Sequence, residues 1–344
     1  RSQAVRLYSR QSWPLSRYDD WLSRIDARQK PDLRHTGEIA VIVAGNDGVD
    51  ETLASLDAVD GKWIVANLPT DPDDDKFDVA SLREFLGGEA GHCATVIFCR
   101  AGIEFAPDCL GRIGDLFART ADALVAYGDL GVRSEDGLCW PIAFPAFDYE
   151  RFLEQGYLGH LFGSPRARVL AGLPTSGAVD LFEVVFSLIS GPEVGSKIFH
   201  LPGECGIVPA GDAFGSSLAL ADAVEGHLAA RGIDAAVQPR KVAMFPSVRV
   251  RRAVPDYSTE ILIPTRNRTE LLRSCIDSIA AGAAKVDARI TVIDNDSDQP
   301  DAKAYLDSLG ARNIRVLRVP GEFNFSKLNN RAVARSDAEV VCLL

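Results

Sequence analysis

The sequence predicts an α/β fold made of two tandem, Rossmann-like domains with mainly parallel sheets, the second of them incomplete. Two observations carry this prediction. Near the C-terminus, an apolar strand centred on residues 261–263 is followed by a polar loop, an amphipathic helix and a second strand, residues 289–293. A similar order of strands and helices begins at residue 38, which indicates an internal repeat. At 344 residues the chain is long enough for two cores.

Composition and charge exclude several classes of function. Apolar content of 47% and charged content of 25% are ordinary for a globular protein. A net charge of −11 argues against nucleic acid as a partner, although it does not exclude an anionic nucleotide. No apolar run approaches the length of a transmembrane helix. The seven cysteines form no CxxC pair, which favours a reducing compartment, so we expect a cytoplasmic protein.

The first part of the chain divides into a lead-in, a domain and a linker. Residues 1–36 are expected to be helical, residues 37–245 to form the first domain, and the basic, proline-marked residues 246–258 to link it to residues 259–344. Strands are expected at 38–43, 62–66, 94–99, 123–127 and 197–201, and helices at 107–117, 180–189 and 216–231.

Three groups of residues in the first domain suggest sites that we do not favour. The glycines at 45 and 48 fall short of a dinucleotide fingerprint. The acidic run 71–75 lacks the alternation and closing glutamate of a calcium loop, so it is expected to be solvated. His92, Cys93 and Cys99 lack ligand spacing and are interpreted as small core residues.

The second domain presents polar residues where its strands end. Pro264 ends the first strand, and the loop Thr265-Arg266-Asn267 follows. A helix is expected to run from about residue 271 to Gly282. The strand at 289–293 leads directly into Asp294. Open α/β sheets bind ligands at the carboxyl ends of their strands, so this edge is the candidate site.

Three motifs in this region resemble a known family. They are Ile263-Pro-Thr-Arg-Asn267, Val292-Ile-Asp-Asn-Asp-Ser297 and Phe323-Asn-Phe-Ser-Lys-Leu-Asn-Asn330. In this order and spacing they resemble the nucleotide-sugar half of a family 2 glycosyltransferase with the GT-A fold, over about residues 255–344. A fainter resemblance to the same family runs through residues 36–245, which would make the first domain a tandem GT-A-like copy.

The resemblance implies a nucleotide-sugar site in the second domain. Its residues would be Pro264, Thr265, Arg266, Asn267, Asp294, Asn295 and Lys327. Asp294 would accept a hydrogen bond from a base N–H, Thr265 and Asn267 would line the base and ribose, and Lys327 would face phosphate near a helix start. Each has a structural alternative: Asp294 as the cap of a turn, and Arg266 and Lys327 as solvated surface residues.

The first copy is expected to be degenerate. Matching the two copies pairs Asn46 with Asn267, Ala66 with Asp294, Ser81 with Lys327, Arg83 and Glu84 with Asn329 and Asn330, and Phe98 with Leu344. Where the family carries metal-binding carboxylates, this copy has Arg100, and a cation there opposes a divalent metal. A metal-free mode in which Arg100 pairs with phosphate stays open.

By resemblance, the parent protein would be an inverting, metal-dependent glycosyltransferase of bacterial surface polysaccharide synthesis. An acceptor hydroxyl of a glycan or lipid-linked precursor would displace the diphosphate of a UDP-, GDP- or dTDP-sugar, assisted by a carboxylate base and by Mg²⁺ or Mn²⁺. The chain starts without Met and ends in an apolar strand at Leu344, so we expect a fragment cut at both ends. The base and the metal ligands are expected beyond Leu344. This chain would then hold no metal ligands, bind no cation and be inactive, and peripheral association with the inner face of the cytoplasmic membrane is a further expectation.

Two other classes of function compete with this interpretation. One is a non-catalytic scaffold that binds nucleotide or glycan, if both copies lack the metal carboxylates. The other is a Rossmann-like oxidoreductase, which the missing glycine fingerprint disfavours.

Overall fold

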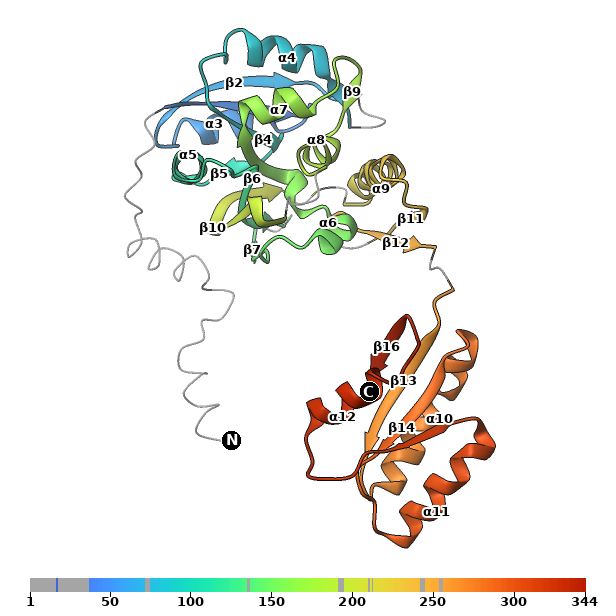
Figure 1. Cartoon of the computed structure of the whole chain (residues 1–344). Helices are drawn as coiled ribbons and strands as arrows, with labels where there is room; N and C mark the ends of the chain where they lie inside the picture. The colour runs from blue at the N-terminus through green and yellow to red at the C-terminus, as the bar shows by residue number, and fades with distance from the viewer. Residues whose placement is uncertain are drawn as a thin grey trace. The chain divides into compact units, whose positions relative to one another are not determined.

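The chain folds into two compact units, the first ending at Arg252 and the second beginning at Ala253 (Figure 1). The computed structural model describes residues 17, 37–71, 75–134, 137–190, 195–209, 211, 213–241, 245–253 and 256–344. The expected helical lead-in lies outside the described residues, apart from residue 17. Part of the expected linker is instead a strand of the first unit, because residues 248–252 pair with residues 235–239. Among the described residues, no helix is both long and apolar enough to cross a bilayer.

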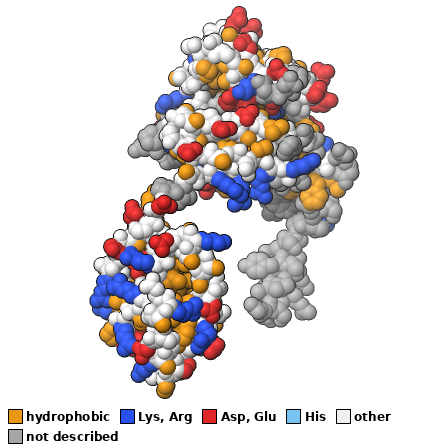
Figure 2. Space-filling view, turned by 90° about the vertical axis from the view of Figure 1, so that its right-hand side faces the viewer, with side chains coloured by type: hydrophobic (Ala, Val, Ile, Leu, Met, Phe, Trp, Pro, Cys, Tyr) orange, Lys and Arg blue, Asp and Glu red, His pale blue; other side chains and the backbone are white. Residues whose placement is uncertain are grey.

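The second unit is a parallel, four-stranded α/β sheet. Its elements in chain order are β13 (Thr259–Thr265), α10 (Thr269–Lys285), β14 (Arg289–Asp294), α11 (Pro300–Ser308), the 3₁₀ turn η4 (Leu309–Arg312), β15 (Arg315–Arg318), α12 (Phe325–Val333) and β16 (Val340–Leu343). The strand order is β15-β14-β13-β16, and every neighbouring pair is parallel. Charged side chains of both signs cover the visible face of this unit, with apolar side chains between them (Figure 2).

Helices cover both faces of this sheet because successive residues of a buried strand point to opposite faces. Ile263 on β13 contributes to a core beneath α10 and α11, which also contains Leu272, Ile276, Ala283, Ile290, Val292, Tyr305, Leu306, Leu309 and Ile314. Leu262, the preceding residue, contributes to the core beneath α12, with Ile293, Val319, Leu328 and Ala332. The expected helix end at Gly282 is wrong. Ala283 still packs into the core and α10 continues to Lys285.

The first unit contains a larger sheet with the order β2-β1-β4-β8-β6-β10-β5 and with β7 beside β6. Its strands are β1 (Glu38–Ala44), β2 (Lys62–Leu68), β4 (Thr95–Arg100), β5 (Glu104–Phe105), β6 (Val125–Arg133), β7 (Cys139–Ile142), β8 (Leu161–Pro165) and β10 (Ile198–Pro209). β2, β1, β4, β6 and β10 run parallel, whereas β8 runs against both of its neighbours. The α/β fold with a mainly parallel sheet is therefore confirmed.

The remaining elements of the first unit flank or extend this sheet. The helices are α3 (Val49–Leu56), α4 (Val79–Gly87), α5 (Cys109–Arg119), α6 (Tyr149–Gln155), α7 (Arg166–Gly172), α8 (Leu181–Leu188) and α9 (Ala213–Ala230), with 3₁₀ turns η2 (Tyr157–His160) and η3 (Gly195–Lys197). The first unit also contains two small antiparallel pairs of strands: β3 (Phe77–Asp78) with β9 (Ala178–Val179), and β11 (Ala235–Pro239) with β12 (Val248–Arg252).

The two units share strand order and register around their first strands. Val41 of β1 pairs with Val65 of β2 and Ile97 of β4, and Leu262 of β13 pairs with Thr291 of β14 and Leu343 of β16. The helix before the fourth strand is also capped alike: Asp78 accepts the N–H of Ser81, and Asn324 accepts that of Lys327. These registers agree with the matching of Phe98 to Leu344 and of Ser81 to Lys327.

One predicted match is wrong. Thr265 pairs with Asp294 in the second unit, and Ala44, its counterpart, pairs with Leu68. Leu68, rather than Ala66, therefore stands at the place of Asp294. Asn67 lies within β2, whereas Asn295 follows the end of β14. The pairing of Ala66 with Asp294 also matches Asn67 with Asn295, and it therefore shifts the two strands out of register by two residues.

Neighbouring leucines of α10 test the assignment of the buried face. Leu272 is 5% exposed and Leu271 is 68% exposed. We expect Leu272→Ala to lower the free energy of unfolding of the second unit by about 2–4 kcal/mol, because it leaves a cavity in the core. Leu271→Ala should change it by less than about 0.5 kcal/mol. Hydrogen exchange of peptides from residues 259–344 measures both changes, and equal effects would contradict the assigned face.

Candidate functional site

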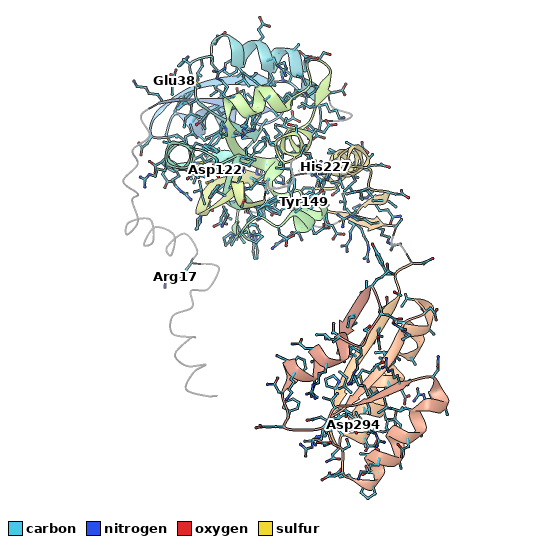
Figure 3. The ribbon with its side chains drawn as sticks, viewed as in Figure 1. Arg17, Glu38, Asp122, Tyr149, His227 and Asp294 are labelled. Atoms are coloured by element: carbon cyan, nitrogen blue, oxygen red, sulfur yellow. The ribbon has the colours of Figure 1, made fainter. Side chains whose placement is uncertain are left out.

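The candidate site lies at the carboxyl ends of β13 and β14. β14 and β16 flank β13 on opposite sides, and α10 and α12 cover opposite faces of the sheet. The strand order reverses between β13 and β16, and open α/β sheets form a binding crevice at such a reversal; β14 is the next strand beside it. Thr265 ends β13 and Asp294 ends β14, and the two residues are paired across the strands. Figure 3 shows Asp294 at the end of β14.

A hydrogen-bonded network ties the two loops together. Asp294 is 5% exposed, and its Oδ1 accepts the backbone N–H of Ser297 at 3.0 Å. The Ser297 hydroxyl in turn accepts the backbone N–H of Asn267 at 3.0 Å. Asn267 has a left-handed backbone, with φ of 53°, and its Oδ1 accepts the N–H groups of Asp298 and Gln299 at 2.9 and 3.1 Å. The alternative role of Asp294, as the cap of a turn, therefore accounts for one of its two carboxylate oxygens. The other oxygen accepts no hydrogen bond from the described residues.

Asn295 has mainly a structural role. It is 1% exposed, and its side-chain N–H group donates to the carbonyls of Val319 and Gly321 at 3.0 and 2.9 Å. Its backbone N–H donates to the carbonyl of Thr265 at 3.0 Å. The side-chain carbonyl is buried and has no partner among the described residues. The side chain thus connects the ends of β14 and β15.

The other predicted residues differ in how closely they belong to this network. Pro264 and Thr265 are half-buried at the end of β13, and Arg266 beside them is exposed. Lys327 lies on α12, with an exposed side chain and a backbone N–H that donates to the Asn324 side chain at 2.9 Å. The structure brings together Thr265, Asn267 and Asp294, and it records no hydrogen bond between Lys327 and this group.

Sequence reasoning missed Asp298, which belongs to the same network. The side-chain N–H group of Asn267 donates to the Asp298 carboxylate at 2.5 Å. A signal was present, because Pro300 sits at the first helical position of α11 and marks the preceding residues as the loop that starts the helix.

Comparison with known proteins identifies this region. A profile of glycosyl transferase family 2 matches residues 260–344, which is nearly the whole second unit. The predicted resemblance is thereby confirmed for this part of the chain.

Two curated relatives share part of the sequence. The uncharacterized protein y4gI of Sinorhizobium fredii is 37% identical over 86 residues, covering 24% of this chain and 10% of that protein. The O-antigen biosynthesis protein RfbC of Myxococcus xanthus is 28% identical over 125 residues, covering 36% of this chain and 9% of that protein. This chain thus spans about a tenth of the length of either relative.

Two solved structures that match this chain have low sequence identity to it and TM-scores below 0.5. Glucosyl-3-phosphoglycerate synthase from Mycobacterium tuberculosis has 12% identity and a TM-score of 0.37, over 71% of this chain and 93% of that chain. The mannosyltransferase PcManGT from Pyrobaculum calidifontis has 12% identity and a TM-score of 0.36, over 92% of this chain and 87% of that chain.

Outside the family 2 segment, side chains of the first unit pack against the carboxyl end of β4, the strand that matches β16. Arg100 ends β4, forms an ion pair with Asp75, and lies 5.2 Å from the centre of the Phe182 ring. Its Nε and Nη2 atoms are buried without partners among the described residues. A guanidinium group at this strand end repels a divalent cation.

Two buried titratable side chains accompany Arg100. Asp180 is fully buried and caps α8, where its carboxylate accepts the N–H of Glu183 at 2.8 Å. Burial raises the pKa of Asp180 to about 7. His160 is 6% exposed, and burial, assisted by the charge of Arg100, lowers its pKa to about 3. The first unit therefore holds a neutral histidine and a carboxyl group of unusually high pKa beside Arg100.

The raised pKa of Asp180 predicts how the stability of the first unit depends on pH. In the unfolded chain this carboxyl ionises near pH 3.8, so the stability that its protonated form contributes is lost as pH rises towards 7. Asp180→Asn cannot ionise and keeps an oxygen for the Glu183 N–H. We expect the variant to match the natural protein near pH 4 and to be more stable by about 1–3 kcal/mol at pH 8.

Tryptophan fluorescence during urea unfolding measures this difference in the first unit alone, because all four tryptophans precede Ala253. Asp122→Asn is the control, since it removes a carboxylate from an exposed position. A pH-independent difference between Asp180→Asn and the natural protein would refute the assignment.

Proposed function

We propose that the second unit is the nucleotide-binding half of a glycosyltransferase that acts in bacterial surface polysaccharide synthesis. The match of residues 260–344 to the family 2 profile supports sugar transfer, and the O-antigen biosynthesis relative supports the biological setting. The observation that carries the proposal is the buried Asp294 carboxylate at the end of β14, one strand from the switch point between β13 and β16. One of its oxygens is held by Ser297, and the other is not used by the described residues.

The chemistry of this edge suits the base of a nucleoside diphosphate. Uracil, thymine and guanine each present a ring N–H donor, and the unused oxygen of Asp294 can accept it. Asn267 fixes the loop that carries Thr265 and Arg266 beside this position. Lys327, in the first turn of α12, supplies a positive charge near a helix N-terminus, which favours phosphate. The proposed donors are therefore UDP-, dTDP- or GDP-sugars.

In the proposed reaction, a hydroxyl of a glycan or lipid-linked acceptor attacks C1 of the sugar and the nucleoside diphosphate leaves, with inversion at C1. A carboxylate base and a divalent cation, Mg²⁺ or Mn²⁺, would assist this step in the family 2 parent. The residues assigned in this chain contribute binding of the donor nucleotide. The base and the metal ligands are not among them.

Asp294→Asn tests the nucleotide site. The substitution keeps an oxygen for the Ser297 N–H but places an N–H₂ group where the base N–H must be accepted. We expect the affinity for UDP, or for dTDP or GDP if one of these binds more tightly, to fall by about 5- to 150-fold, which corresponds to about 1–3 kcal/mol. Isothermal titration calorimetry of the whole chain measures the change.

Two control variants accompany this measurement. Asp277→Asn makes the same charge change at an exposed position of α10 and should leave affinity unchanged. Asn46→Ala alters the corresponding loop of the first unit and should also have no effect. Equal loss in Asn46→Ala would assign the nucleotide to the first unit. Unchanged affinity in Asp294→Asn would refute the proposed base contact.

An assay of sugar transfer tests whether this chain is active by itself. We expect no sugar transfer by this 344-residue chain with UDP-, GDP- or dTDP-sugars and Mn²⁺, because Arg100 stands at the strand end where the first unit would need carboxylates. Without a cation to offset the charge of the leaving diphosphate, the barrier to transfer rises by several kcal/mol.

An active family 2 enzyme, assayed with the same donors, is the positive control. Metal-dependent transfer by the chain would show that the first unit is not degenerate. Nucleotide binding without transfer by a longer form of the protein would favour the scaffold alternative.

A further inference from the structure

Three metal-binding side chains converge at the amino-terminal edge of the first unit's sheet. Glu38 is the first residue of β1, and His92 and Cys93 lie just before β4. The carboxylate, imidazole and thiol ligand atoms all lie within 4.8 Å of one another. His92 Nε2 forms a hydrogen bond to the Glu38 carboxylate and lies 3.8 Å from the Cys93 sulfur. Figure 3 shows Glu38 where the chain enters the sheet.

The fold brings these residues together because β1 and β4 are parallel neighbours. Ile39 pairs with Thr95, so the residues just before each strand meet at one edge. The lack of ligand spacing among His92, Cys93 and Cys99 predicts no metal site for that group. The Cys99 side chain is instead fully buried in the core along β4. Glu38, which is distant in the sequence, takes its place in the group.

The thiol is held in position by the backbone around it. The Cys93 N–H donates to the carbonyl of Ala90 at 3.0 Å, and its carbonyl accepts Arg166 Nε at 2.9 Å. Cys93 is 1% exposed, whereas the His92 side chain is 57% exposed. The group is therefore fixed on its protein side and open to solvent on the other.

We propose that Glu38, His92 and Cys93 form a binding site for a divalent transition metal, with Zn²⁺ as the ion that best suits the ligands. Thiolate, imidazole and carboxylate are the three side-chain ligands of protein zinc, and water would complete the tetrahedron on the solvent side. Mg²⁺ and Ca²⁺ prefer oxygen ligands and are poorly matched to a thiol. The site lies at the opposite ends of the strands from Arg100, so it is separate from the degenerate copy of the nucleotide site.

Binding must displace the thiol proton. Burial, followed by the charge of Glu38, raises the pKa of Cys93, and Arg166 partly opposes this. The S–H bond is therefore replaced by an S–metal bond, and the proton leaves to the buffer. The Arg166 guanidinium is held on the backbone side of the site, where it also donates to the carbonyl of Leu86 at 3.2 Å.

Titration of the whole chain with Co²⁺, followed by absorption, tests the site, because only a thiolate ligand produces a sulfur-to-cobalt charge-transfer band. We expect one Co²⁺ per chain, a band that Cys93→Ser abolishes, and displacement of the cobalt by Zn²⁺. His92→Ala and Glu38→Gln should weaken Zn²⁺ binding by more than about tenfold each. His92 is exposed, so its variant reports on binding even if Cys93→Ser folds poorly.

Cys342→Ser is the matched control, since it removes an exposed thiol from the second unit. It should leave the band and the affinity unchanged. Failure of the natural protein to bind Co²⁺, or a band that persists in Cys93→Ser, would overturn the proposal. So would loss of the band in Cys342→Ser, or Zn²⁺ affinity that is unaffected by His92→Ala and Glu38→Gln.

Discussion

Parallel pairing of neighbouring strands determines where the chemically important side chains of both units lie. Because β13 and β14 run in the same direction, Thr265 and Asp294 end at one edge, and the loops that follow can be joined by hydrogen bonds. The same rule places Glu38 beside the residues that precede β4, at the amino-terminal edge of the first unit. Backbone pairing in the sheet is thus sufficient to make neighbours of residues that are far apart in the sequence, without any contribution from their side chains.

At the carboxyl edge, the two units use this placement differently. The second unit keeps polar loops tied to one another and leaves one carboxylate oxygen unused by the described residues. The first unit instead carries a guanidinium group that pairs with Asp75 and lies over Phe182, beside the buried Asp180 and His160. Burying these groups is costly unless they are paired or neutral, which explains a pKa near 7 for Asp180 and an uncharged His160. The carboxyl edge of the second unit therefore keeps a carboxylate oxygen without a partner among the described residues, whereas that of the first unit carries a paired guanidinium group.

Local sequence patterns predicted the strands and helices, and long-range contacts account for what they missed. The apolar runs at 38–43 and 261–263 and the polar residues after them were sufficient to locate β1, β13 and the edge that carries Asp294. The continuation of α10 beyond Gly282 was missed because packing of Ala283 outweighs the poor helix propensity of one glycine. The approach of Glu38 to His92 was also missed, because strand pairing across 54 positions leaves no local signal.

The asparagine that follows the first strand has a structural role in both units, so it cannot by itself distinguish a nucleotide site. Asn46 Oδ1 accepts the backbone N–H of Thr70, and Asn267 Oδ1 accepts the backbone N–H of Asp298. The difference lies one strand away. At the position of Asp294 the first unit has Leu68, which is 6% exposed and can accept no hydrogen bond from a base. The proposed base contact therefore depends on the one paired strand-end position at which a carboxylate in the second unit is replaced by an apolar side chain in the first, independently of the metal carboxylates.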